Sequence, residues 1–154
     1  MTSNDAQSMD LLSLAELAST RALTVTELEA LNNANFGLDR NLGLRYTLIE
    51  PGRVVSELRV SSKHLQVVGL VNGGVYAAIA ESTGSVASMV AAPGTMVVGV
   101  NNNTDFISAV SSGVITAEAT PIQIGGRTHL WQIECTHQGE VVARTTLRTM
   151  VLKK

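Results

Sequence analysis

The residues whose types and spacing suggest chemistry lie between positions 66 and 85. Glu81 is the one carboxylate in a run of small and apolar residues at 75–92, and Gly73 and Gly74 stand directly before that run. A carboxylate inside an apolar helix is costly to bury unless it is paired or functional, and burial makes it a stronger base when it ionises. Free N–H groups at a helix start, beside glycines that allow close approach, stabilise an oxyanion. The stretch therefore combines a base with an oxyanion site.

Each of these residues also has an interpretation without chemistry. For Glu81 it is a carboxylate hydrogen-bonded for structure alone, and for Gly73 and Gly74 it is close packing of a helix against a strand. Gln66 is equally compatible with a solvated loop. Ser85 lies four residues after Glu81, and a serine within a helix often bonds the carbonyl four residues earlier. The residue types alone leave these alternatives open.

The composition excludes several other classes of protein. The 154 residues suffice for one domain with a sizeable core, and the net charge of −2 gives no electrostatic footprint for nucleic acid. No apolar run is long enough to span a bilayer, and the N-terminus lacks the pattern of a signal peptide, so we expect no membrane partner and a cytoplasmic location. With 45% hydrophobic and only 16% charged residues, the chain is expected to bury surface in an oligomer.

The cysteine and the histidines do not indicate a metal site. Cys135 is the single cysteine, which excludes a disulfide within the chain, and its alternating segment predicts a buried, inert thiol. His64, His129 and His137 do not share the spacing of metal ligands. We therefore expect no bound metal, and we expect His64 to be exposed beside the loop that contains Gln66.

The N-terminal part of the chain is predicted to be helical. Regularly spaced leucines indicate a short helix around 11–17. A second helix is expected to be capped by Thr26 and to end near 32–33, because the carboxylates of Glu27 and Glu29 suit the positive end of its dipole. We interpret this part as an extension that packs on the domain or covers it.

Strands are predicted on both sides of the long helix. Alternating runs at 44–48 and 54–60 form a hairpin whose turn is Pro51-Gly52. The long helix is expected to stop at 92–94 (Ala-Pro-Gly), because proline cannot continue it. Turn residues then separate four further strands, which we expect at 95–107, 114–124, 127–137 and 140–152. They are predicted to form three successive hairpins, the first with its turn at 111–113.

The long helix is apolar nearly all round and needs cover on most of its surface. In a chain of this order, a curved antiparallel sheet must supply that cover. We therefore predict an α+β protein with the hotdog fold, in which a curved antiparallel β-sheet wraps around a long central helix. Residues 1–40 are predicted to be an N-terminal helical extension, and residues 41–154 the hotdog domain.

Residues 72–81 (NGGVYAAIAE) resemble a family signature. They are similar to the His-Gly-Gly-Val-x-Ala-x-Leu-Ala-Asp/Glu pattern of hotdog-fold acyl-CoA thioesterases, of the type found in phenylacetate catabolism and of 4-hydroxybenzoyl-CoA thioesterase. The likeness extends to 101–106, 111–113 and 125–128, and it covers roughly residues 44–152. It implies hydrolysis of an acyl-CoA thioester to free acid and CoA, with the CoA thioester as substrate and no cofactor.

The resemblance also implies a role for each site residue. Glu81 matches the catalytic carboxylate, which acts as nucleophile or as general base on water. Gly73 matches the glycine whose N–H polarises the thioester carbonyl, and Gln66 matches the glutamine that contacts the thioester or the attacking water. Ser85 matches a serine or threonine that assists the carboxylate in some members. Asn72 stands where the family has histidine, and because its amide does not titrate, any proton transfer at this position is lost.

The spacing of Gly73 and Glu81 bears on the oligomeric state. Eight residues of helix span about 12 Å at ~1.5 Å per residue, so one thioester carbon cannot contact both. We therefore expect the two groups to come from two subunits whose helices run antiparallel at a two-fold axis, which makes a homodimer the minimum. The resemblance implies that such dimers pair into homotetramers. Four bulky residues are candidates for the wall of the acyl pocket: Tyr76, Met89, Phe106 and Trp131.

The predicted fold also allows two other functions. A non-catalytic acyl-CoA-binding or regulatory hotdog protein is compatible with Asn72 and would bind acyl-CoA without releasing the thiol. Hotdog dehydratases pair a histidine with a carboxylate, and the missing histidine at position 72 argues against that activity.

Overall fold

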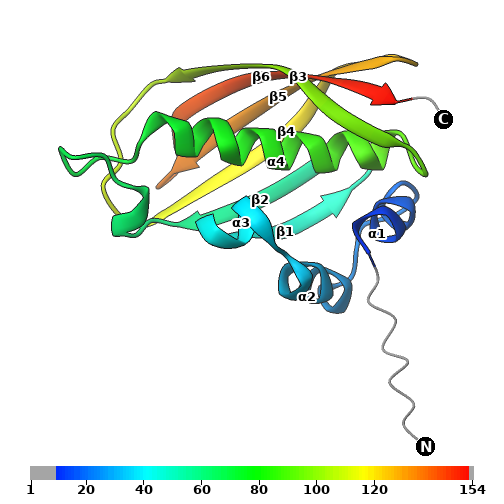
Figure 1. The fold of residues 1–154 in the computed structure, drawn as a ribbon, viewed down its shortest axis with the longest axis horizontal. Coiled ribbons are helices and arrows are strands. Elements are labelled where there is room, and N and C mark those ends of the chain that lie inside the picture. Colours follow the sequence, from blue (N-terminus) through cyan, green and yellow to red (C-terminus); the bar gives the residue numbers. More distant parts are fainter. Residues whose placement is uncertain (1–9, 153–154) are drawn as a thin grey trace, which may run out of the picture.

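The structure is a computed structural model that describes residues 10–152 (Figure 1). Residues 1–9 of the predicted extension and residues 153–154 lie outside the described part. The helices are α1 (Leu11–Ala18), α2 (Val25–Ala34), α3 (Gly37–Leu42), the short 3-10 helix η1 (Ser62–His64) and α4 (Gly73–Ala91). The strands are β1 (Leu44–Glu50), β2 (Arg53–Arg59), β3 (Met96–Phe106), β4 (Val114–Ile124), β5 (Thr128–His137) and β6 (Glu140–Leu152).

Helix α4 lies along one face of the sheet, which curves around it (Figure 1). Asn72 caps its start, and the chain turns away at Pro93 and at Gly94, whose φ is 72°. Gly84 faces the sheet so closely that a Cβ there would collide with Leu147, a fully buried residue of β6. The long helix, its apolar environment and its predicted end are confirmed.

The six strands form one antiparallel sheet in the order β1-β2-β4-β5-β6-β3. Each predicted strand is present, but the predicted order is wrong at the first of the three hairpins. Strand β3 pairs with β6 at one edge, and β4 pairs with β2 instead. The connection at 107–113 therefore crosses the sheet rather than making a tight turn. It passes the start of α4, where Val110 is buried and its carbonyl accepts the Val71 N–H at 2.8 Å.

The N-terminal helices pack against the rest of the molecule. Leucines of α1 and α2 belong to the same hydrophobic core as α4 and the sheet, among them Leu14, Leu28 and Leu31. Helices α1 and α3 contact α4, and α2 contacts β1. The predicted short helix around 11–17 is confirmed as α1. The division of the chain after residue 40 stays a proposal.

Two details of this part differ from the prediction. The cap of α2 is Thr24 and not Thr26, because Thr24 makes a capping box: its hydroxyl accepts the Glu27 N–H at 3.3 Å, and Glu27 accepts the Thr24 N–H at 2.8 Å. Helix α3 is not predicted from the sequence. It contains no buried residue, so it lacks the apolar periodicity by which a helix is recognised.

Candidate active site

The start of α4 presents a backbone donor. The side chain of Asn72 accepts the Gly74 N–H at 2.8 Å, and its carbonyl accepts the Val75 N–H at 2.9 Å. Among residues 10–152, none accepts a hydrogen bond from the Gly73 N–H. That N–H is therefore free to bind a ligand, and its role as an oxyanion donor stays a prediction. The amide oxygen of Asn72 holds the helix start, a role that needs no titratable side chain.

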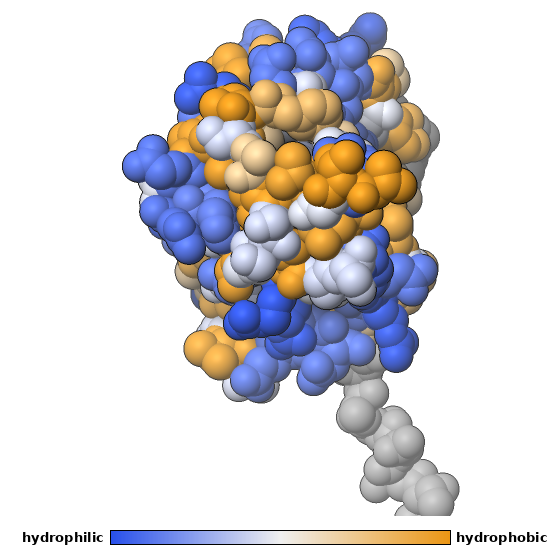
Figure 2. Space-filling model, turned by 90° about the vertical axis from the view of Figure 1, so that its left-hand side faces the viewer, coloured by the Kyte–Doolittle hydropathy of each residue, from blue (hydrophilic) through white to orange (hydrophobic). Residues whose placement is uncertain are grey.

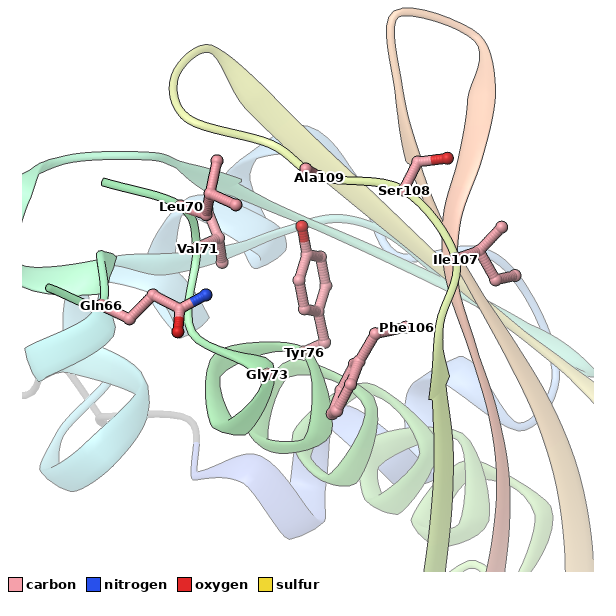
Figure 3. Close-up of a pocket in the computed structure, with 9 residues that line it drawn as sticks. All are labelled: Gln66, Leu70, Val71, Gly73, Tyr76, Phe106, Ile107, Ser108 and Ala109. Carbon is pink, nitrogen blue, oxygen red and sulfur yellow. The ribbon is translucent and has the colours of Figure 1, made fainter. Parts of the chain in front are cut away.

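A cavity of about 380 Å³ opens beside this helix start; we call it the first cavity (Figure 3). Its lining comes from the loop before α4, the first turn of α4, the last residue of β3 and the segment that follows β3. Figure 3 shows the amide of Gln66 directed toward the side chain of Tyr76. A Cβ at Gly73 would lie 2.5 Å from the ring of Phe106, so any larger residue there would have to displace this exposed side chain. The structure thus brings Gln66 and Gly73 together.

His64 holds the loop that presents Gln66. Its Nδ1 accepts the Ser61 N–H at 2.9 Å, so Nε2 carries the proton and donates to the carbonyl of Leu42 at 2.8 Å. The carbonyl of His64 accepts the Asn72 N–H at 2.9 Å. The predicted exposure of His64 is wrong, because its side chain is buried and joins the loop to the end of α3.

Glu81 lies two turns further along α4, half-buried against the edge strand β3. Its Oε1 packs on the backbone of Gly99, where any Cβ would collide with the carboxylate. Its Oε2 accepts a hydrogen bond from the Asn102 amide at 3.1 Å. The register of β3 against β6 shifts between Gly99 and Asn101, and this bulge is followed directly by Asn102.

Asn102 is itself fixed in orientation. Its amide nitrogen also donates to the carbonyl of Ala77 at 3.0 Å, and its amide oxygen accepts the Thr104 hydroxyl at 2.7 Å. The Thr104 hydroxyl lies 2.7 Å from that of Thr145, a buried residue of β6. Because a carbonyl can only accept, the amide must turn its N–H groups toward Ala77 and Glu81. Asn102 therefore positions the carboxylate.

Glu81 lines a second cavity, of about 240 Å³, between α4 and the N-terminal helices. Ser85 lies in the same wall, one turn after Glu81. Asp39 of α3 accepts hydrogen bonds there from the hydroxyls of Ser82 at 2.5 Å and Tyr46 at 3.2 Å. The apolar lining of the second cavity comes from α1, α2 and α4: Leu11, Leu31, Val86 and Met89.

The predicted site residues thus fall into two groups in one chain. Gln66 and Gly73 line the first cavity, and Glu81 and Ser85 line the second. Of the predicted pocket residues, Tyr76 and Phe106 line the first cavity and Met89 the second. The prediction that Trp131 lines the pocket is wrong, because this residue is fully buried in the core, where its Nε1 donates to the Ser88 hydroxyl at 2.6 Å.

Cys135 is inert in the folded protein. Its side chain is buried, and burial raises the pKa of its thiol to about 12. The thiolate, which is the reactive form, is therefore scarce at neutral pH, as the sequence indicated. Among residues 10–152, no cluster of three or more His, Cys, Asp or Glu side chains is placed to hold a metal ion. No helix within those residues is long and apolar enough to cross a membrane.

The surface near the first cavity is apolar. Figure 2 shows the side of the molecule at the left of Figure 1, where α4 begins, and apolar side chains gather near its centre. The exposed apolar residues on the segments that border the cavity are Val67, Val68, Phe106 and Ile107. A second exposed apolar set lies on the edge strand β3: Met96, Val98 and Val100.

A single long helix wrapped by a curved six-stranded antiparallel sheet is the hotdog fold, and the chain is similar to a solved thioesterase structure over 82% of its length. The chain belongs to the thioesterase superfamily, whose family model matches residues 68–143. A candidate esterase of Mycobacterium tuberculosis is 40% identical over 126 residues, which cover 79% of this chain and 90% of that protein. Its solved structure has a TM-score of 0.72, with 41% identity, and covers 75% of this chain and 96% of that one.

Two further relatives carry more specific names. A 1,4-dihydroxy-2-naphthoyl-CoA hydrolase of Listeria monocytogenes is 31% identical over 119 residues, 77% of this chain and 97% of that protein. The solved structure of a thioesterase from Haemophilus influenzae has a TM-score of 0.77 at 30% identity, and covers 82% of this chain and 90% of that one. The chain is a thioester hydrolase, which confirms the predicted family, fold and class of enzyme.

Proposed function

We propose that the protein hydrolyses an acyl-CoA thioester to the free acid and CoA, at a site to which two subunits contribute. The observation that supports this proposal is the separation of the site residues within one chain. Gln66 and Gly73 line the first cavity, whereas Glu81 and Ser85 line the second. Eight residues of helix between Gly73 and Glu81 amount to about 12 Å, too far for one carbonyl carbon.

The edge of the sheet suits such a pairing. Strand β3 is an edge strand with exposed apolar side chains, and Glu81 packs against it through Gly99 and Asn102. Two β3 strands that meet antiparallel about a two-fold axis bring two α4 helices side by side in opposite directions. Glu81 of one subunit then approaches Gly73 of the other. A homodimer is the minimum assembly in this proposal, and a homotetramer is two such dimers.

Each residue has a defined part in the proposed reaction. The Gly73 N–H donates to the thioester carbonyl oxygen and stabilises the negative charge that develops there. Gln66 contacts the thioester or the attacking water. Glu81 of the partner subunit acts as nucleophile or as general base on water, and Ser85 beside it assists. In either route the carbon–sulfur bond breaks, the oxygen of water ends on the acyl carbon, and one proton of that water passes to the sulfur, so that CoA leaves as the thiol.

Replacing Glu81 tests the chemistry. Glu81→Gln keeps the shape of the side chain and its contact with Asn102 but removes the base. We expect kcat to fall by about 10²- to 10⁴-fold, measured as thiol release from short, long and aromatic acyl-CoAs. The matched control is Glu57→Gln, a change at an exposed glutamate of β2, which should leave kcat unchanged. Full activity of Glu81→Gln would contradict the proposal.

Mixed subunits test the shared site. A Glu81→Ala subunit lacks the carboxylate but keeps Gln66, and a Gln66→Ala subunit has the opposite defect. In a purified dimer of one of each, a shared site leaves one complete site of two, so about half of the wild-type activity returns. If each site lay within one chain, the mixed dimer would stay as inactive as its parents. Light scattering of the wild type distinguishes dimer from tetramer, and a fully active monomer would exclude the shared site.

The remaining expectations rest on the same experiments. Thiol release by the wild type separates hydrolysis from the non-catalytic acyl-CoA-binding alternative. Membership of the thioesterase superfamily already argues against that alternative. CoA as the thiol component is proposed from the resemblance and from the named substrate of the Listeria relative. A cytoplasmic location stays a prediction from the sequence.

A further inference from the structure

Tyr76 has a hydroxyl that the fold does not use. Its side chain is 3% exposed, and in the described part of the chain its Oη is the buried side-chain nitrogen or oxygen atom that lacks a hydrogen-bond partner. The other tyrosine, Tyr46, donates its hydroxyl to Asp39, and Trp131 donates its Nε1 to Ser88. A buried hydroxyl without a partner destabilises a folded protein, and native structures hold few of them. This exception therefore calls for a function.

The place of this hydroxyl points to a ligand. Tyr76 follows Gly73 by three residues, so both lie on the same side of α4, and both line the first cavity with Gln66. Figure 3 shows the ring of Tyr76 standing up from the helix between the loop at 70–71 and the segment at 108–109, with its hydroxyl at the tip. The ring packs on Phe106, with centroids 6.2 Å apart.

We propose that the Tyr76 hydroxyl is a substrate-binding group of the first cavity, which donates a hydrogen bond to an oxygen of the bound acyl-CoA. The inference rests on the proposed function. Burial, and to a lesser degree the neighbouring Cys135, raises the pKa of Tyr76, so the group remains a neutral hydroxyl and a donor at physiological pH. Its acceptor is a carbonyl or hydroxyl oxygen near the thioester that Gly73 holds.

Such an acceptor has two sources in an acyl-CoA. One is an amide carbonyl of the pantetheine arm, which every acyl-CoA contains. The other is a polar substituent of the acyl group itself. The two sources are distinguished by comparing benzoyl-CoA with 4-hydroxybenzoyl-CoA as probes. A loss of affinity common to both indicates the pantetheine arm, and a loss confined to 4-hydroxybenzoyl-CoA indicates the acyl group. Either result supports the proposal.

The test is Tyr76→Phe, which removes the hydroxyl and keeps the ring against Phe106. We expect KM to rise roughly 3- to 10-fold with kcat nearly unchanged, as for the loss of one hydrogen bond that is equal in ground and transition states. The thermal midpoint of the unliganded protein should stay constant or rise, because an unsatisfied group has been removed. Tyr46→Phe is the control, since its hydroxyl is bonded to Asp39, and it should lower the thermal midpoint.

Binding to a hydrolysis-deficient protein keeps this test separate from the proposed function. The Kd of each probe is measured for Glu81→Gln with and without Tyr76→Phe. A higher Kd in the double variant supports the role of Tyr76 even if the wild type turns over neither probe. Three results would overturn the inference. The first is that Tyr76→Phe changes neither the Kd nor the KM of either probe. The others are that neither probe binds, or that Tyr76→Phe lowers the thermal midpoint.

Discussion

The carboxylate of Glu81 is positioned by a neighbouring strand rather than by its own helix. Gly99 supplies the space for one oxygen, and Asn102 donates to the other. Thr104 and Thr145 continue this hydrogen-bond chain into the sheet. Because the Thr104 hydroxyl fixes the amide orientation of Asn102, the carboxylate has one preferred direction, as its proposed catalytic role requires.

The Asn102→Ala variant tests this positioning. Loss of this hydrogen bond leaves the carboxylate free to turn away from its preferred direction. We expect kcat to fall about tenfold, with KM nearly constant if Asn102 acts through Glu81 alone. The matched control is Asn101→Ala, since Asn101 is exposed and points to the other face of β3. An unchanged kcat, or a change in KM alone, would contradict the role.

The sequence predicts Gln66, Gly73, Glu81 and Ser85 because the helix start and its apolar run are local patterns. It does not predict Asn102, which stands among three successive asparagines at 101–103. Which of these faces the helix depends on the bulge after Gly99, and that bulge is a property of the pairing with β6. No sequence pattern within β3 alone predicts this bulge.

At the level of elements, the contact between α4 and the sheet depends on Gly84. A Cβ at this position would collide with Leu147 and lie 3.2 Å from Ile133, and both residues are fully buried. Gly84→Ala gains about 1 kcal/mol of helix propensity, but overpacking of a buried contact costs about 1–3 kcal/mol. We expect a net loss of about 1 kcal/mol, measured by urea denaturation.

A second substitution identifies the cause of that loss. Leu147→Val removes a methyl group from the place where the new Cβ would lie. If overpacking is responsible, Gly84→Ala combined with Leu147→Val should lose less stability than the sum of the two single losses. Strictly additive losses would show that the glycine acts through something other than this contact.

Local turn signals predict three of the four expected strand pairs correctly. The predicted hairpins β1–β2, β4–β5 and β5–β6 form because short turns with glycine fix their partners. The residues at 111–113 contain the same kind of signal, yet β3 and β4 do not pair. Partner choice there is non-local, since the connection has to cross the start of α4 and Val110 becomes buried beneath it. The cap of α2, by contrast, was readable from Thr24 and Glu27 as a capping box.

At the level of the whole molecule, one polar cluster joins three elements in the core. The Ser88 hydroxyl of α4 accepts from Trp131 of β5, and lies 2.6 Å from the Thr149 hydroxyl of β6 and 3.3 Å from His129 Nδ1. Burial lowers the pKa of His129 below its ordinary value of 6.5. The folded protein therefore holds this imidazole neutral at a pH where the unfolded chain protonates it.

The sign of the resulting pH dependence follows. Well above pH 6.5 His129 is neutral in both the folded and the unfolded state, and its contribution to stability is fully present. As the pH falls from there through the lower pKa of the folded state, the unfolded chain binds more protons and stability declines. We expect the thermal midpoint to fall over this range, and less steeply in His129→Gln. An equally steep decline in that variant would exclude His129 as a cause.

The crossed strand order also bears on synthesis. Strand β3 leaves the ribosome well before β6, its only strand partner in the sheet order. Until residues 140–152 have emerged, β3 has no paired strand to fix the bulge after Gly99, and Thr145, which continues the hydrogen-bond chain behind Asn102, is absent. Pairing between strands so distant in sequence is slow. The last strand to be made therefore completes the support of a carboxylate that was made some sixty residues earlier, at Glu81.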